Sequence, residues 1–127
     1  METLTLIGGF AILGAWARYG QTLLVQKVAG REFPWATLSI NVLGSFLMGY
    51  LFIWTTRVIP TSPDLRIGIL VGGLGAYTTF STFALESLLL FEDGFAIKGF
   101  LYMFLSLGLC VFAAFMGTLA SQMMGGG

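Results

Sequence analysis

Polar side chains recur at every fourth position in three long apolar stretches of this chain. In the first of the three, Thr37, Asn41 and Ser45 have this spacing. Residues four apart lie on one face of a helix, so each set forms a polar stripe. The other two stripes are Thr78, Thr82 and Glu86, and Tyr102, Ser106 and Cys110.

These stripes offer hydrogen-bond donors that, apart from Glu86, carry no charge. Hydroxyl groups and the Asn41 carboxamide can donate hydrogen bonds to a small anion in place of its water, and still release it. The alternative is that the stripes only hold helices together, because Ser, Thr and Asn commonly hydrogen-bond between membrane helices. Three stripes in 127 residues favour a hydrophilic track.

Phe80 and Phe83 lie three residues apart beside the hydroxyl residues of the third stripe. Their spacing places both rings on one helix face. The edge of an aromatic ring is positive and can contact a small, hard anion, although packing is the usual role of Phe in an apolar helix.

Arg18 and Glu86 are the only charged residues inside the apolar stretches. Each lies toward one end of its stretch, where a long side chain can reach the membrane surface. Glu86 could instead be a functional carboxylate or a partner of Arg18.

Composition and length indicate that membrane-spanning helices carry all these residues. Apolar residues make up 57% of the chain and charged residues only 9%, whereas soluble domains have about 25% charged residues. A bilayer core requires about 20 apolar residues in a helix. The sequence therefore predicts an all-α integral membrane protein with one domain, 1–127, and four helices at about 4–24, 35–56, 67–91 and 99–122.

The third predicted helix contains Gly72, Gly73 and Gly75 near its middle. Glycines there can let a helix break, provided that the freed backbone is buried in protein or lines a cavity. An unbroken helix that uses the glycines for close packing is the alternative.

Enzyme chemistry is not indicated. The chain has no His and only one Cys, and no nucleophile–base pair, metal cluster or GxxxxGK[ST] loop can be assembled from it. The net charge is zero, so nothing suggests nucleic acid as a partner.

The Lys and Arg residues outside the membrane give only a weak orientation signal. With four spans, one side would hold two of them and the other three, or four with Arg18. A single poorly marked orientation and insertion in both orientations, with antiparallel pairing, are both compatible with this balance.

Three sequence blocks resemble the Fluc (CrcB) family of fluoride channels. The blocks are GAWAR followed by Tyr19, then ATLSINVLGSFLMG, then GGLGAYTTFSTFALES. They cover three of the four predicted helices.

The resemblance implies a passive fluoride-selective channel in the bacterial inner membrane, built as an antiparallel, dual-topology homodimer with two pathways and a broken third helix. It implies that Phe80, Phe83 and Asn41 contact fluoride, and that backbone carbonyls of Gly75 and Thr78 bind a central sodium ion. Arg18 would lie at a vestibule, where we also place Glu86. The remaining lining residues would be Ser81, Thr82, Thr37, Tyr102 and Ser106.

Two other functions remain open from the residues themselves. A small dual-topology, proton-coupled multidrug exporter would need an embedded carboxylate, for which Glu86 is the one candidate. A non-transporting assembly subunit would use the stripes only to join helices.

Overall fold

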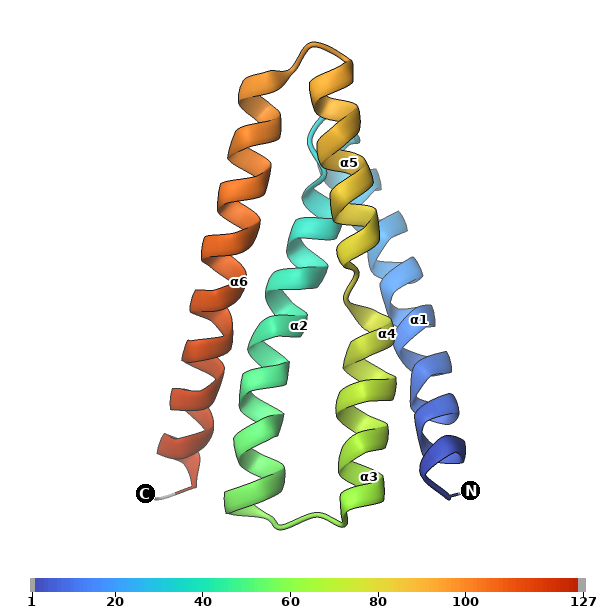
Figure 1. Ribbon diagram of the computed structural model, residues 1–127, viewed down its shortest axis with the longest axis vertical. Helices are drawn as coiled ribbons and strands as arrows, with labels where there is room; N and C mark the ends of the chain where they lie inside the picture. The colour runs from blue at the N-terminus through green and yellow to red at the C-terminus, as the bar shows by residue number, and fades with distance from the viewer. Residues whose placement is uncertain (1, 126–127) are drawn as a thin grey trace.

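The computed structural model describes residues 2–125, which fold into long helices joined by short connections (Figure 1). The stretches Glu2–Ala29 and Ala96–Met124 are each one continuous helix. The stretches Trp35–Val58 and Pro63–Glu92 include segments of π-helix. The elements are α1 (Glu2–Ala29), α2 (Trp35–Ile53), η1 (Trp54–Val58), α3 (Pro63–Ile67), η2 (Gly68–Leu74), α4 (Gly75–Tyr77), α5 (Phe80–Glu92) and α6 (Ala96–Met124).

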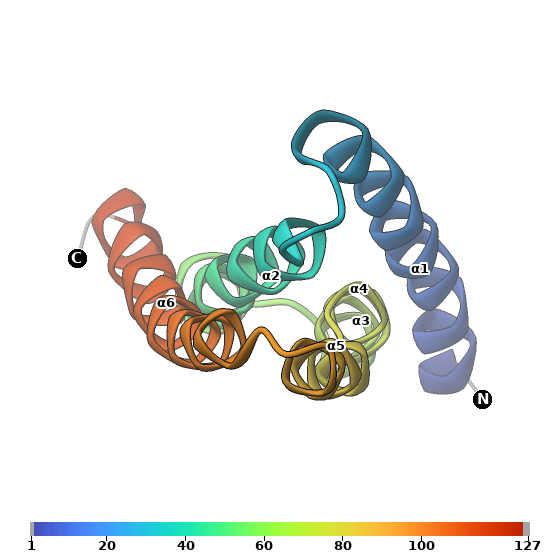
Figure 2. The same cartoon turned by 90° about the horizontal axis from the view of Figure 1, so that it is seen from above.

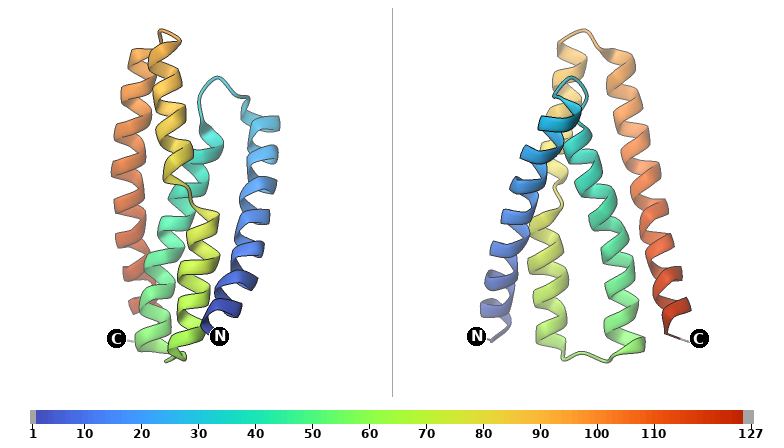
Figure 3. Two further views of the ribbon diagram at one scale, coloured as in Figure 1. Left: turned by 45° about the vertical axis from the view of Figure 1, so that its right-hand side comes forward. Right: turned by 180° about the vertical axis from the view of Figure 1, so that it is seen from behind.

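The helices run up and down the long axis, so that both ends of the described chain lie at the same end of the molecule (Figure 1). Seen from above, α1 and α6 lie at opposite sides, with α2 and the broken rod α3–α5 between them (Figure 2). The helix α2 packs along α6, and α1 packs against η2. The rods spread apart toward one end (Figure 3).

Three helical stretches are long and apolar enough to cross a membrane: Trp35–Val58, Pro63–Glu92 and Ala96–Met124, with mean hydropathies of 1.7, 1.3 and 2.1. The chain is therefore an all-helical, multi-pass membrane protein. The helix α1 is as long as these stretches, but it is not among them. Arg18 and Gln21 lie within α1 and lower its hydropathy, so its role as a fourth span stays a prediction.

The helix ends differ from the predicted ones because local turn signals extend the helices beyond the apolar core. The first helix continues past residue 24 to Ala29 and stops at Gly30, whose φ of 79° lies in the left-handed region. The third rod begins at Pro63, where the Ser62 hydroxyl caps the helix by accepting the Leu65 N–H.

The predicted break in the third rod is present, but it lies beyond the glycines. Thr78 and Thr79 are extended, with φ, ψ of −82°, 158° and −150°, 120°. Gly72 is still helical and packs on α1, where a Cβ atom would lie 2.4 Å from the Ile7 carbonyl oxygen. Close packing is therefore the role of this glycine, and the predicted break near the middle of the third helix, 67–91, is confirmed at Thr78 and Thr79.

The contact between α2 and α6 depends on two glycines that let the backbones touch. A Cβ atom on Gly49 would lie 2.1 Å from the Ala114 carbonyl oxygen, and one on Gly117 would lie 2.1 Å from that of Phe46. Small residues commonly let the backbones of membrane helices approach this closely. This contact fixes the α6 polar residues beside those of α2.

Candidate functional site

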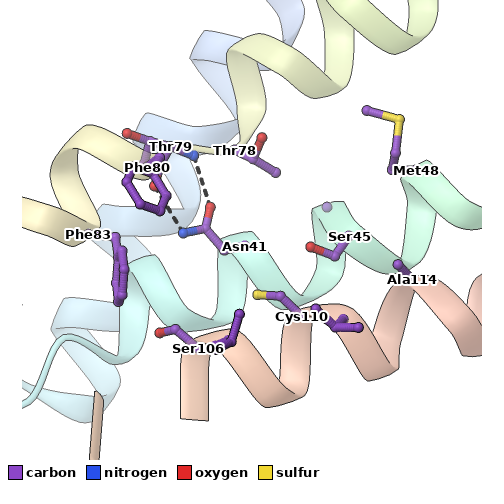
Figure 4. A pocket seen from close by; sticks show the side chains of 13 residues that line it. Asn41, Ser45, Met48, Thr78, Thr79, Phe80, Phe83, Ser106, Cys110 and Ala114 are labelled. Carbon is purple, nitrogen blue, oxygen red and sulfur yellow. Dashed lines mark hydrogen bonds between the residues drawn. The ribbon is translucent and has the colours of Figure 1, made fainter. Parts of the chain in front are cut away.

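A groove of about 410 Å³ lies where α2, the helix break, the first turn of α5 and the middle of α6 meet (Figure 4). None of its lining residues within 2–125 is charged. Its polar groups come from the amide and hydroxyl side chains predicted as stripes, with two aromatic rings at one end. The lining residues are Asn41, Gly44, Ser45, Met48, Thr78, Thr79, Phe80, Phe83, Ser106, Leu107, Cys110, Val111 and Ala114.

Asn41 joins α2 to the broken rod by two hydrogen bonds with Thr79. Its Nδ2 donates to the Thr79 carbonyl oxygen at 3.0 Å, and the Thr79 N–H donates to its Oδ1 at 2.9 Å (Figure 4). These bonds fix which way the carboxamide faces, because a backbone N–H only donates and a carbonyl only accepts. One of the two Nδ2 hydrogens is left without a partner on Thr79.

The break frees carbonyl groups that an unbroken helix would use. In an α-helix the Gly75 carbonyl would accept the Thr79 N–H, but that N–H donates to Asn41. The Thr78 carbonyl would likewise accept the Thr82 N–H, which donates to the Thr79 hydroxyl at 3.3 Å instead. Thus the two carbonyls predicted to bind a cation have both lost their helical donors.

Phe80 and Phe83 both line the groove, as their spacing predicted. Their ring centroids are 5.5 Å apart and the rings are tilted by 58°. Phe83 also packs edge-on against Tyr102, at 5.1 Å between centroids. Phe80 contacts Phe83 alone among the rings of residues 2–125, and 78% of its surface is exposed in a single chain. Other apolar side chains of this membrane protein, such as Trp16 and Phe104, are exposed to a similar extent, at 71% and 70%.

The α6 stripe divides into an upper hydrogen-bonded part and a lower part that lines the groove. Tyr102 is fully buried, and its hydroxyl donates to Glu86 Oε1 at 3.0 Å. The Thr37 side chain lies near the same hydroxyl. Ser106 is only 7% exposed, and its Oγ has no hydrogen-bond partner within residues 2–125.

The structure brings together some of the predicted site residues and separates others. Asn41, Phe80, Phe83 and Ser106 share the groove, while Thr37, Tyr102 and Glu86 form the adjoining cluster. Within a single chain, the groove is not lined by Ser81, which is exposed, nor by Thr82 or Arg18.

The prediction of a third stripe was wrong for Thr78, whereas Thr82 and Glu86 keep their four-residue spacing within α5. The break falls between the first two residues, so the four-residue spacing no longer places them on one face. Thr78 remains at the groove, and Glu86 turns to Tyr102 on α6.

Sequence reasoning missed the importance of Thr79 and of Gly44. The Thr79 backbone is the partner of Asn41. A Cβ atom on Gly44 would lie 2.2 Å from Thr78 Cγ2 and 3.2 Å from the Tyr77 ring, so this glycine makes room for the break. Gly44 follows Asn41 by about one helical turn, and that spacing was the one available signal.

The fold and the groove define a class: a multi-pass helical membrane protein with an uncharged, hydrogen-bonding groove at a broken helix. A family model described as CrcB-like protein, Camphor Resistance (CrcB), matches residues 5–118. The chain therefore belongs to the CrcB-like family, which confirms the resemblance seen in the sequence.

Three relatives that match most of this chain share one name, fluoride-specific ion channel FluC. The protein from Acidithiobacillus ferrooxidans is 69% identical over 94% of this chain and 96% of its own length. That from Magnetococcus marinus is 46% identical over 88% and 91%. That from Geobacter sulfurreducens is 39% identical over 98% and 100%.

Proposed function

We propose that this chain is the subunit of a passive, fluoride-selective ion channel and not an enzyme. The observation that carries the proposal is the groove around Asn41, which combines neutral hydrogen-bond donors with aromatic rings and has no charged residue among its described lining. The relatives named as fluoride-specific ion channels support the same function.

Two donors in the groove are available to an anion. One Nδ2 hydrogen of Asn41 is not used by Thr79, and the buried Ser106 hydroxyl has no partner among residues 2–125. An unsatisfied buried hydroxyl costs about 1–3 kcal/mol, which an accepting ion would offset. Neutral donors bind an anion less tightly than a fixed positive charge would, and a conducting ion must also leave.

The pathway needs a second chain. The exposed Phe80 ring stands at the open side of the groove, and covering it from a partner would enclose the ion. We assign the partner to a second copy in antiparallel orientation, with two pathways per dimer and α1 as a fourth span. Support comes from the nearly equal number of basic residues at the two ends of the helices. Arg57 and Arg66 flank the lower connection, and Lys27, Arg31 and Lys98 lie near the upper ones. Such a balance is compatible with insertion in both orientations.

The remaining predicted residues fit around this pathway. Thr37 and Tyr102 would continue it beyond Phe83, and Ser81 and Thr82 would face the partner chain. Arg18 and Glu86 would lie at the vestibules. Such a channel would serve in the bacterial inner membrane, where neutral hydrogen fluoride enters, ionises in the more alkaline cytoplasm, and leaves as fluoride under the membrane potential.

A central sodium ion would be held by the freed carbonyls of Gly75 and Thr78 from both subunits. Unwound backbone in a broken membrane helix is a typical sodium site, because its carbonyl oxygens have lost their helical donors. The ion would supply positive charge at the dimer centre and tie the two breaks together.

The exporter alternative is not favoured by the position of its one carboxylate. Glu86 accepts a hydrogen bond from Tyr102 and does not line the groove, so a drug in the groove would not meet it. If the chain were a proton-coupled exporter, its transport would also follow a proton gradient.

Fluoride efflux from proteoliposomes tests the proposal. Vesicles loaded with potassium fluoride are diluted into fluoride-free buffer, and valinomycin is added to carry the balancing charge. We expect rapid fluoride release that depends on valinomycin, and no release of chloride from matched vesicles. Absence of fluoride release from folded protein, or release driven by a proton gradient without valinomycin, would overturn it.

A further inference from the structure

Gln21 is a polar residue of α1 that does not line the groove at Asn41, and yet its side chain bonds to two other helices. Its Oε1 accepts a hydrogen bond from the Tyr77 hydroxyl of α4, and its Nε2 donates to Ser39 Oγ of α2 at 3.1 Å. The Ser39 hydroxyl donates in turn to the Ala36 carbonyl oxygen at 2.8 Å. One carboxamide thus joins α1, α2 and the broken rod.

Tyr77 is the last helical residue before the break, and α1 and α2 enclose it closely. It is only 6% exposed. A Cβ atom on Gly14 of α1 would lie 3.1 Å from the Tyr77 backbone nitrogen, and one on Gly44 of α2 would lie 3.2 Å from its ring. Gly14 and Gln21 are about two helical turns apart on one face of α1. The helix α1 therefore contacts Tyr77 both at its backbone and at its hydroxyl.

Two anchors on different helices flank Thr78, where the backbone leaves the helix with a ψ of 158°. Before it, Gln21 holds the Tyr77 hydroxyl. After it, Asn41 holds the Thr79 backbone by two hydrogen bonds. The direction of the Thr78 carbonyl depends on both neighbours, because the peptide group that carries it lies between the two anchored residues.

We propose that Gln21 is a positioning residue of the channel: by holding Tyr77, it sets the direction of the Thr78 carbonyl that the central sodium ion requires. The hold on the break follows from the hydrogen bonds alone, whereas its consequence for sodium rests on the proposed function. A carboxamide suits this task because it accepts one hydrogen bond and donates another without a charge. Polar side chains are costly inside a membrane and are usually paired or functional there.

Two substitutions remove the same contact in different ways. Tyr77→Phe removes only the hydroxyl and keeps the ring against Gly44. Gln21→Leu removes the carboxamide and keeps a side chain of similar bulk. If the hydrogen bond between the two residues is what holds the break, the combined variant should behave like Gln21→Leu alone, because coupled residues are not additive. Gln26→Leu is the matched control on α1, since Gln26 is not a member of this hydrogen-bond network.

Amide hydrogen exchange of the purified protein tests the hold on the break without any flux. The readout is a peptide over residues 77–83, which contains the Thr79 N–H that donates to Asn41. We expect its exchange to be about two- to tenfold faster in Gln21→Leu and in Tyr77→Phe, the range that the net free energy of one hydrogen bond supports. Gln26→Leu should exchange as wild type does.

A second peptide, over residues 113–121 of α6, reports general loosening of the fold and should be unchanged in all variants. Unchanged exchange at 77–83 in Gln21→Leu and Tyr77→Phe, or equal acceleration in both peptides, would overturn the hold on the break. A combined variant that exchanged much faster than Gln21→Leu would also overturn it, because the two residues would then act separately.

Binding of radioactive sodium to the purified protein then tests the consequence for the site. We expect the sodium dissociation constant to rise about two- to tenfold in Gln21→Leu and Tyr77→Phe, and to stay at the wild-type value in Gln26→Leu. An unchanged constant in variants whose break exchanges faster would overturn the positioning role. If wild type bound no sodium, the proposed sodium site would fail, and the exchange result would still decide whether Gln21 holds the break.

Discussion

Asn41 and Thr79 are joined by two hydrogen bonds, one in each direction, although α2 and the helix break lie far apart in sequence. The side-chain amide thus supplies both a donor and an acceptor to backbone that has left the helix. The same residue lines the groove and keeps a further N–H. Asn41 therefore has two tasks, to hold the break in shape and to offer a donor to the ion.

Asn41→Asp is expected to abolish fluoride efflux. An ionised carboxylate can accept the Thr79 N–H, but it cannot donate to the Thr79 carbonyl, and it places a negative charge where an anion must pass. We expect a loss of about 1–3 kcal/mol in stability, the cost of an unsatisfied buried group. Efflux and thermal melting measure the two effects, and efflux at the wild-type rate would show that Asn41 is not on the pathway.

Phe80→Ile and Phe83→Ile should both stop efflux but differ in stability. Phe80 is mostly exposed in one chain and pairs with Phe83, so its loss should lower the melting temperature less than loss of Phe83 does. Phe83 packs against Tyr102, and its replacement should cost about 0.5–1.5 kcal/mol. Phe104→Ile, an exposed α6 position outside the groove, is the control. Efflux lost equally in the control would point to a general packing defect.

Gly117→Ala should destabilise the protein, whereas Gly108→Ala on the same helix should not. The added methyl group at Gly117 meets the Phe46 carbonyl oxygen at 2.1 Å, while nothing lies within 4 Å of one at Gly108. Overpacking of this kind typically costs about 1–3 kcal/mol. Thermal melting in detergent distinguishes them, and matching melting temperatures would contradict the close α2–α6 contact.

Sodium should stabilise the protein if the freed carbonyls of Gly75 and Thr78 bind it. An ion that binds only the folded state contributes about 2.7 kcal/mol at one hundred times its dissociation constant. We expect the melting temperature to rise with sodium chloride and to stay constant with N-methylglucamine chloride at equal ionic strength. A rise that is the same in both salts would argue against a specific site.

The helices could be predicted from the sequence because membrane spans follow from length and hydropathy, and the polar faces of α2 and α6 follow from spacing. A break near the middle of the third predicted helix was also predicted, but the residues that leave the helix and the partner that stabilises them could not be. Glycine-rich sequence near Gly72 and Gly73 suggested it, yet the chain leaves the helix at Thr78 and Thr79, where Asn41 on another helix supplies the replacement hydrogen bonds. Since this partner is distant in sequence, local propensity does not reveal it, and the stripe drawn through Thr78 and Thr82 was wrong for the same reason.

The central claim, passive conduction selective for fluoride, is tested most directly by the reversal potential of the current through a planar bilayer. Sodium is kept equal on both sides. Fluoride is high on one side and low on the other, where chloride replaces most of it. We predict a current that reverses at the Nernst potential for fluoride and ignores a proton gradient. No current, or reversal at a potential set by chloride, sodium or protons, would contradict the account.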